Sequence, residues 1–241
     1  MTEFEPHGIE VALIIPALNE EAVICQTLDA IPQGLYRLII VADNGSSDRT
    51  AELAAAHGAT VVSEPERGYG AACLKAIASL PASIDAVVFM QADSSELAEE
   101  ARSLLDPIAR GEADLVVGSR VLGKAEAGAL LAHQMFGNQV ATTLIRWIWG
   151  HPYTDLGPFR AISTTKLKLL NMRDRNFGWT VEMQIRAIQH NLRILEVPVS
   201  YRLRAAGENK VSGNFQASIM AGVKIIWVIL RLQFDYFSPL T

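Results

Sequence analysis

The first half of the chain alternates between two kinds of hydrophobic pattern. Short runs of apolar, often β-branched residues lack the in-and-out alternation of a half-exposed strand, which is typical of strands covered on both faces. These runs cover residues 11–15, 37–42, 59–63, 85–90 and 114–118. We therefore expect each of them to be a buried strand.

Helical patterns lie between these runs, at residues 20–30, 49–57, 70–80 and 97–110. Asn19 precedes the first of them, and Gly58 and Gly111 follow the second and the fourth, as helix-capping residues do. Strands that alternate with helices favour right-handed βαβ units. The expected fold class is α/β, a doubly wound and mainly parallel sheet with helices on both faces. Ligands of such sheets bind beyond the carboxyl ends of the strands.

The regular alternation of short strands and helices ends after about residue 120. A long apolar helical region (127–149) is followed by a helix near 177–190, a strand at 193–199, a basic loop at 201–210 and a helix from about Phe215. No Pro/Ser-rich linker, repeat or low-complexity tract separates the two halves. We therefore expect the second half to complete the same domain.

Composition and charge narrow the possible partners. Of the 241 residues, 50% are hydrophobic and 20% charged, which suits a compact protein with a large core. The net charge of -5 argues against nucleic-acid binding, because such a protein needs a surplus of Lys and Arg. Cys25 and Cys73 lie in helical patterns, so we expect packing roles in a reducing compartment.

Two apolar stretches bear on membrane contact. The stretches 127–145 and 211–230 approach the length of about 20 apolar residues that a spanning helix needs, but polar residues interrupt both. The N-terminal stretch carries no secretory signal pattern. We expect a cytoplasmic protein whose apolar helices can lie peripherally at the inner membrane face. Its exposed aromatic candidates, which are core residues in the alternative interpretation, are Trp147, Trp149, Trp227, Tyr236 and Phe237.

Polar residues follow the second and third expected strands. Asp43 leads into an Asn44-Gly45 turn, where it can stabilise the turn or accept hydrogen bonds from a base or ribose. Gly68 and Gly70 open the next helix, where free N–H groups favour an anion. A tight strand-to-helix turn explains these glycines equally well.

The sharpest signal follows the fourth expected strand, in the segment QADSSE (residues 91–96). Asp93 is a single aspartate at a strand end flanked by oxygen-bearing side chains, which suits a hard divalent cation that protein oxygens ligate only in part and substrate phosphates complete. Such a cation neutralises a diphosphate leaving group. The alternative is a capped helix start at Ser94 or Ser95.

Basic residues gather near the C-terminal end of an acidic chain. Arg202, Arg204 and Lys210 lie in the loop 201–210, which is either a solvated basic loop or a clamp on an anionic acceptor or diphosphate. A phosphate acceptor is already ionised and needs no general base, whereas a hydroxyl acceptor does. Glu182 and Asp155 are the candidate bases, and either can instead be structural. His133 lies in an apolar helical stretch, which is typical of a core histidine, with a place in the acceptor site as the alternative.

Several segments together resemble glycosyltransferase family 2, most closely its dolichyl-phosphate mannose synthase type. They occur in the family's order over residues 9–212, and they are IIPALNEE, IIVADNGSSDRT, RGYGAA, VVFMQADSSE, VVGSR, TDLGPFRAI, EMQIRAI and EVPVSYRLRAAGENKV. The resemblance implies a GT-A fold, a nucleotide diphosphate sugar as donor, Mg²⁺ or Mn²⁺ as cofactor, and inversion at the sugar. It also implies one domain, with a nucleotide-sugar half at 9–120 and an acceptor half at 121–241.

The resemblance also assigns roles by position. The residues implied to bind the nucleotide sugar are Pro16, Leu18, Asn19, Glu20, Asp43, Gly68, Gln91, Ala92 and Arg120. Asp93 falls on the metal-binding acid of the family's Asp-x-Asp motif, and Ser95 on a position that can add a ligand. Arg204 and Lys210 fall on basic residues that face the phosphates, and Glu182 remains the candidate base.

Three positions depart from the family pattern. Gln91 replaces the first acid of the Asp-x-Asp motif, Asn44 replaces a frequent second acid, and Asn209 stands where serine is usual. Loss of a carboxylate should lower metal affinity, although an amide oxygen can still accept from ribose. The expected reaction is transfer of a hexose to a polyprenyl phosphate. The alternatives are a soluble hydroxyl acceptor and a non-catalytic nucleotide-sugar-binding protein.

Overall fold

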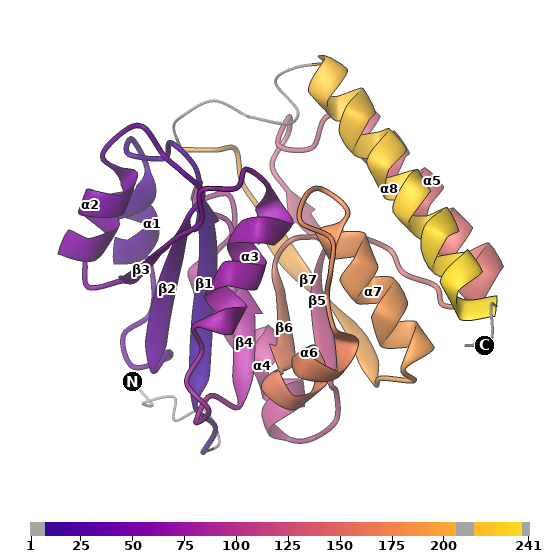
Figure 1. Cartoon of the computed structure of the whole chain (residues 1–241), viewed down its shortest axis with the longest axis horizontal. Coiled ribbons are helices and arrows are strands. Elements are labelled where there is room, and N and C mark those ends of the chain that lie inside the picture. Colours follow the sequence, from indigo (N-terminus) through magenta and orange to yellow (C-terminus); the bar gives the residue numbers. More distant parts are fainter. Residues whose placement is uncertain (1–7, 206–214, 238–241) are drawn as a thin grey trace.

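The computed structural model describes residues 8–205 and 215–237. In these residues seven strands form one sheet in the order β3-β2-β1-β4-β6-β5-β7 (Figure 1). Strand β6 is antiparallel to its neighbours β4 and β5, and the other pairs are parallel. The strands are β1 (Val11–Ala17), β2 (Leu38–Asp43), β3 (Thr60–Ser63), β4 (Ala86–Phe89), β5 (Leu115–Ala125), β6 (Arg160–Ser163) and β7 (Ile194–Tyr201).

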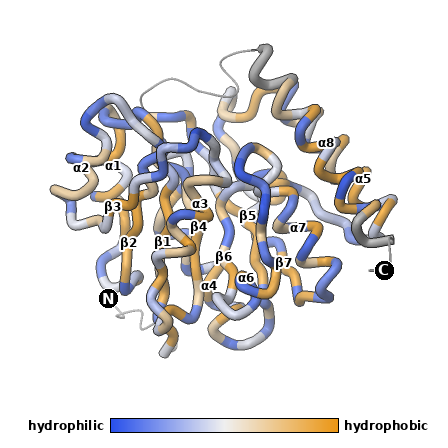
Figure 2. Tube along the Cα trace, in the orientation of Figure 1, coloured by the Kyte–Doolittle hydropathy of each residue, from blue (hydrophilic) through white to orange (hydrophobic). Residues whose placement is uncertain are grey.

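Helices cover both faces of the sheet, because successive strand residues point to opposite sides and both sides are apolar. Ile14 and Phe89 pack in the cluster that contains residues of α3, α5, α6, α7 and α8, whereas Leu13 and Val88 pack in the cluster with α1, α2 and α4. Figure 2 shows the hydrophobic residues along the central strands. The helices are α1 (Ile24–Asp29), α2 (Thr50–Ala56), α3 (Tyr69–Ala78), α4 (Ala101–Ala109), α5 (Ala132–Trp149), α6 (Thr164–Leu170), α7 (Trp179–Gln189) and α8 (Phe215–Phe237), with a 3₁₀ turn η1 (Ala98–Glu100).

The expected α/β, doubly wound and mainly parallel sheet is confirmed. The pattern placed the early strands within a few residues, but β5 runs to Ala125, well past its expected end at 118. Strand β6 and helix α6 were not anticipated. Strand β6 was missed because Arg160, one of its four residues, interrupts the apolar pattern. The fully buried Arg160 guanidinium donates to the carbonyls of Thr180, Leu156 and Gly157.

Helices α5 and α8 lie side by side at one edge of the molecule (Figure 1). Lys224 of α8 pairs with Asp174 at 2.9 Å, and Gln189 of α7 donates to the Leu232 carbonyl at 3.0 Å. These contacts fix α8 against α7 and the loop before it. Within residues 8–205 and 215–237, no helix has the length and apolarity that crossing a membrane requires.

Candidate active site

A cavity of about 630 Å³ opens at the carboxyl ends of β1 and β4. It is the place where a doubly wound sheet binds its ligands. Many of the expected site residues line it, namely Pro16, Leu18, Glu20, Gly68, Gln91, Ala92, Asp93, Arg120 and Arg204. Asn19, Asp43, Ser95 and Glu182 do not line it directly, and Lys210 and Asn209 lie outside the described residues.

The turn after β1 is fastened to the turn after β2. Asn19 has a positive φ of 49° and accepts a hydrogen bond from the Ser47 N–H at 2.8 Å, while its own N–H donates to the Ser46 hydroxyl. The Glu20 N–H donates to the Thr50 hydroxyl at 2.7 Å. Asn19 therefore shapes the loop that presents Leu18 and Glu20 to the cavity.

Asp43 and Asn44 hold the neighbouring loops in place. The Asp43 carboxylate accepts from the Ser46 N–H at 3.2 Å beneath the surface of the cavity. The Asn44 amide donates to the carbonyls of Glu64 and Glu66, and its oxygen accepts from the Gly68 N–H at 2.7 Å. The Asp43 hydrogen bond thus agrees with the turn interpretation. The Asn44 amide group donates hydrogen bonds, which a carboxylate at this position could not do.

Gly68 and Gly70 admit a close approach of two backbones. A Cβ on Gly68 would lie 2.1 Å from the Arg175 carbonyl oxygen, and one on Gly70 would lie 2.1 Å from that of Asp174. The Ala71 N–H donates to the Arg175 carbonyl at 2.8 Å. The glycines therefore let the loop that carries Asn176 and Phe177 reach the cavity wall at the start of α3.

Asp93 lies at the centre of the polar end of the cavity. It is 5% exposed, and one carboxylate oxygen accepts from the Ser95 N–H at 3.0 Å and from the Ser95 hydroxyl. Its other oxygen lies 3.2 Å from a guanidinium nitrogen of Arg204. Ser94 adopts a positive φ of 58°, and the 3₁₀ turn η1 begins only at Ala98, so no helix starts at Ser94 or Ser95. The alternative of a capped helix start there is wrong.

The oxygen atoms at this point suit a hard cation only if water or a bound ligand supplies the rest of the shell. Asp93 offers a carboxylate, and Ser95 offers a hydroxyl that holds it in place. Among the residues that the structure describes, no three His, Cys, Asp or Glu side chains gather as a metal site. The residues therefore fit Mg²⁺ or Mn²⁺ held jointly with diphosphate oxygens, and they do not form a closed protein cage.

Gln91 is oriented by its neighbours. Its amide oxygen lies 3.3 Å from the Ser95 hydroxyl and 3.4 Å from the Tyr201 hydroxyl, and its backbone N–H donates to Glu96 at 2.7 Å. Burial raises the pKa of Glu96 to about 8, and the nearby Asp93 charge adds to this effect. The sequence reasoning missed Glu96 and Tyr201 as parts of the site, although Glu96 is the last residue of QADSSE.

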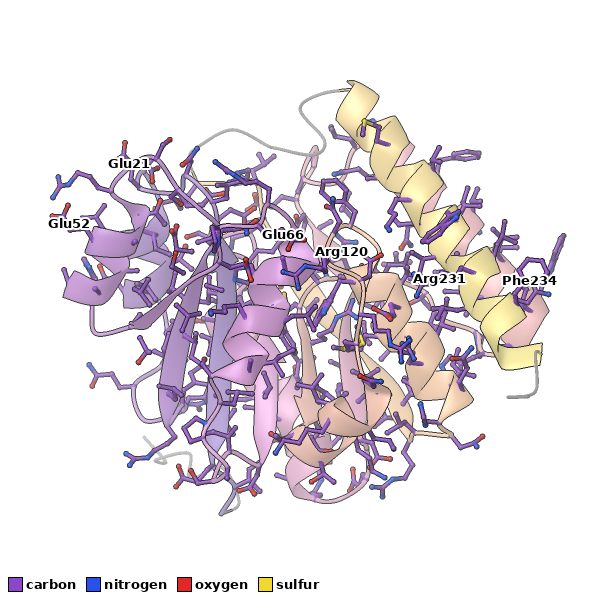
Figure 3. The ribbon with its side chains drawn as sticks, in the orientation of Figure 1. Glu21, Glu52, Glu66, Arg120, Arg231 and Phe234 are labelled. Atoms are coloured by element: carbon purple, nitrogen blue, oxygen red, sulfur yellow. The ribbon has the colours of Figure 1, made fainter. Side chains whose placement is uncertain are left out.

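Arg120 is held by Asp155. Two guanidinium nitrogens lie 2.8 Å from the two oxygens of the Asp155 carboxylate, whose residue is 1% exposed, and the Arg120 backbone N–H donates to it as well. The guanidinium also lies over the Tyr201 ring, 5.1 Å from its centroid. Asp155 therefore positions Arg120 at the cavity, which agrees with a structural role for Asp155. Figure 3 labels Arg120 among the side chains.

Two expectations for helical residues are corrected by packing. Glu182 is 2% exposed and accepts from the backbone N–H groups of Arg173 and Asp174 and from Arg186, so it fastens a loop and is not a base in the cavity. His133 is exposed and lines the cavity, so it is not a core histidine. The periodicity of a helix does not say which face its neighbours will cover.

The sequence profile of glycosyl transferase family 2 matches residues 12–168. The chain belongs to this family. An uncharacterised glycosyltransferase of Mycobacterium tuberculosis is 37% identical over 218 residues, which are 89% of this chain and 95% of that protein. A dolichyl-phosphate hexose transferase of Haloferax volcanii is 32% identical, over 92% of this chain and 95% of that protein.

The fold agrees with the family. The structure is similar to that of glucosyl-3-phosphoglycerate synthase from Mycobacterium tuberculosis in complex with Mn²⁺, UDP-glucose and phosphoglyceric acid. The TM-score is 0.74 at 24% identity, covering 94% of this chain and 80% of that one. The GT-A fold is confirmed, and the protein is a family 2 glycosyltransferase.

Proposed function

We propose that the protein transfers a hexose from a nucleotide diphosphate sugar to a polyprenyl phosphate, with inversion at the anomeric carbon. The observation that supports a lipid acceptor is the composition of the cavity wall. Its polar lining carries Asp93, Glu20 and three arginines, whereas the cavity also reaches helices α5 and α8. There the lining combines the apolar Leu156, Phe177, Ala221 and Ile225 with Gly137 and Gly222 and with the polar His133, Gln134 and Asn138 of α5.

The donor would bind at the polar end. Pro16, Leu18 and Glu20 at the end of β1 would contact the nucleoside, and Gln91 and Ala92 would face ribose and diphosphate. Mg²⁺ or Mn²⁺, held by Asp93 and Ser95 with the diphosphate, would neutralise the charge of the leaving group. Arg120, Arg204 and Lys210 would attract the phosphates of donor and acceptor.

A phosphate acceptor fits the side chains around the cavity better than a hydroxyl acceptor. In the part of the chain that the structure describes, the carboxylates lining the cavity are those of Glu20 and Asp93, and both pair with Arg204. An ionised phosphate oxygen can form its bond to the anomeric carbon without a general base. The bond from that carbon to the diphosphate breaks, and the nucleoside diphosphate leaves with the electron pair.

The surface beside the apolar end favours contact with a membrane. Helix α8 exposes Met220, Val223, Trp227, Leu230 and Phe234, and α5 exposes Met135, Phe136 and Trp147. Phe234 points away from the body of the molecule (Figure 3). Lys224 and Arg231 lie over the Trp227 ring at 4.6 and 5.3 Å, a mixture of aromatic and basic groups that suits a lipid headgroup region. The side chains of Tyr236 and Phe237 lie outside those described.

Transfer of labelled sugar tests the acceptor. The protein is incubated with several nucleotide sugars and Mn²⁺, and with either short-chain polyprenyl phosphate or soluble acceptors such as small sugar acids. We expect product with the polyprenyl phosphate. Turnover with the soluble set alone would instead favour the second candidate, which the phosphoglyceric acid in the complex of the similar structure suggests.

The Asp93→Ala variant separates an enzyme from a non-catalytic nucleotide-sugar-binding protein. It should lower turnover by roughly 100-fold or more, because a bound cation contributes several kcal/mol to the departure of a diphosphate. A wild-type protein that binds nucleotide sugars without hydrolysis or transfer would contradict the proposal.

A further inference from the structure

One guanidinium contacts both acids at the polar end of the cavity. A terminal nitrogen of Arg204 lies 2.7 Å from each carboxylate oxygen of Glu20, and the other terminal nitrogen lies 3.2 Å from Asp93. Glu20 is 7% and Asp93 5% exposed, so little water competes for these contacts. Arg204 therefore places positive charge directly against two buried acids, which such acids require.

The backbone places Arg204 there. We call residues 202–205, which follow β7, the strap. The Arg202 N–H donates to the Ser95 carbonyl at 2.8 Å, and the Ala205 N–H donates to the Asp93 carbonyl at 3.3 Å. The Leu203 N–H donates to Glu126 at 2.9 Å. The strap is thus paired with the segment that carries Asp93, and the contact does not depend on the reach of a long side chain alone.

A divalent cation would compete with this contact. One oxygen of Asp93 already accepts two hydrogen bonds from Ser95, so the oxygen beside Arg204 is the one with room for a further positive partner. Two positive groups against one carboxylate oxygen repel each other strongly in a site of low exposure. Cation and guanidinium therefore compete for Asp93.

We infer that Arg204 is an internal counter-cation, which holds Asp93 and Glu20 in the donor-free protein and leaves Asp93 when a divalent cation binds with the diphosphate. The inference rests on the metal use of the proposed function. After its release from Asp93, the Arg204 guanidinium can contact the phosphates, whose negative charge increases as the diphosphate leaves. Since linkage is reciprocal, the cation must bind more weakly while Arg204 is in place.

The test is the affinity of the donor-free, full-length protein for Mn²⁺, measured by titration calorimetry. Arg204→Gln should bind Mn²⁺ about tenfold more tightly than the wild type. Arg204→Lys keeps the charge but lacks the planar fork that bridges two carboxylates, so its affinity should lie between the two. Arg202→Gln, two residues away on the exposed part of the strap, loses the same charge and should change the affinity far less.

The outcomes separate this inference from the proposed metal use. Unchanged or weaker Mn²⁺ binding by Arg204→Gln, with binding lost in Asp93→Asn, would overturn the counter-cation while leaving metal use intact. Absence of Mn²⁺ binding in every variant, even with UDP or GDP present, would overturn both. Circular dichroism checks that each variant folds. If Arg204→Gln does not fold, the comparison is made with Arg204→Lys, and tighter Mn²⁺ binding by Arg204→Lys than by the wild type supports the counter-cation.

Discussion

At the scale of single residues, the glycines near the cavity do two different things. Gly70 has no room for a side chain, because a Cβ would lie 2.1 Å from the Asp174 carbonyl oxygen. Gly222 on α8 has nothing within 4 Å of the same position. Gly70→Ala should therefore lower the free energy of unfolding by about 2 kcal/mol, as overpacking does. Gly222→Ala should raise it by up to about 1 kcal/mol, because alanine restricts the unfolded chain.

Urea unfolding of the two variants measures this difference. The pair is matched, since each change adds one methyl group to a helix beside the same cavity. Equal effects of the two substitutions would mean that the contact between α3 and the loop before α7 is looser than the structure has it.

Asp114 gives a residue-scale prediction for pH. The Arg193 side chain donates to it at 2.8 and 3.1 Å and lowers the pKa of its carboxyl below the usual value. A lowered folded-state pKa stabilises the protein above the unfolded pKa of about 3.9, and this stabilisation is lost as the pH falls through the folded value. Asp114→Asn should therefore lower the melting temperature at pH 7 but make progressively less difference below pH 4.

Thermal melts of wild type and variant between pH 7 and pH 3 check the sign. A difference in melting temperature that stays constant down to pH 3 would show that the loss comes from packing and not from the charge.

The positions of residues at the cavity were predictable from the sequence only where the course of the backbone alone decides them. Asp93 and Gln91 follow a buried strand, so the carboxyl end of β4 had to carry them to the crevice. Glu182 and His133 lie on helices, where the exposed face depends on what packs against the helix. No local pattern showed that the Glu182 carboxylate would accept hydrogen bonds from the loop before α7.

At the scale of elements, α8 presents an unusual apolar face. Its exposed side chains include Met220, Trp227 and Phe234, the last of which is 71% exposed. Phe234→Asp should reduce binding to vesicles of zwitterionic and anionic phospholipids by about tenfold, since it removes apolar contact and adds a negative charge. It should leave the melting temperature nearly unchanged because the side chain packs little.

Leu169→Asp provides the control for α8. Leu169 is 48% exposed on α6, so the substitution makes the same change in charge and apolarity elsewhere on the surface. Vesicle cosedimentation of both variants gives the comparison. A loss of binding that is equal in the two would point to net charge and not to the α8 face.

A strand or helix was predictable from the sequence to the extent that its own local pattern decides its conformation. Strands β1, β2 and β4 are apolar runs, and burial on both faces leaves no other place for them. The expectation of a buried strand is wrong for β3, which lies at the edge of the sheet with Thr60 and Ser63 exposed. Strand β6 is decided by its neighbours, because it fills the gap between β4 and β5 and buries Arg160 among backbone carbonyls. Such a strand depends on contacts distant in sequence, which a local pattern does not contain.

At the scale of the whole molecule, the order of the strands joins the two halves of the chain. Strand β6 of the second half lies between β4 and β5 of the first half, and β7 pairs along β5. A nucleotide-sugar half covering residues 9–120 would therefore lack a central strand of its own sheet. We expect the chain to unfold as one cooperative unit and the fragment 1–120 not to fold alone.

The sequence supplies a separate probe for each half. All four tryptophans lie between residues 147 and 227, so their fluorescence reports the second half. Cys73 is fully buried on α3 in the first half, and in a Cys25→Ser background its reaction with a thiol reagent reports unfolding there. The two probes should give the same urea midpoint, because loss of β6 exposes the edges of β4 and β5 together. Midpoints that differ by more than the error of the fits would show that the halves are separate folding units joined only by a shared sheet edge.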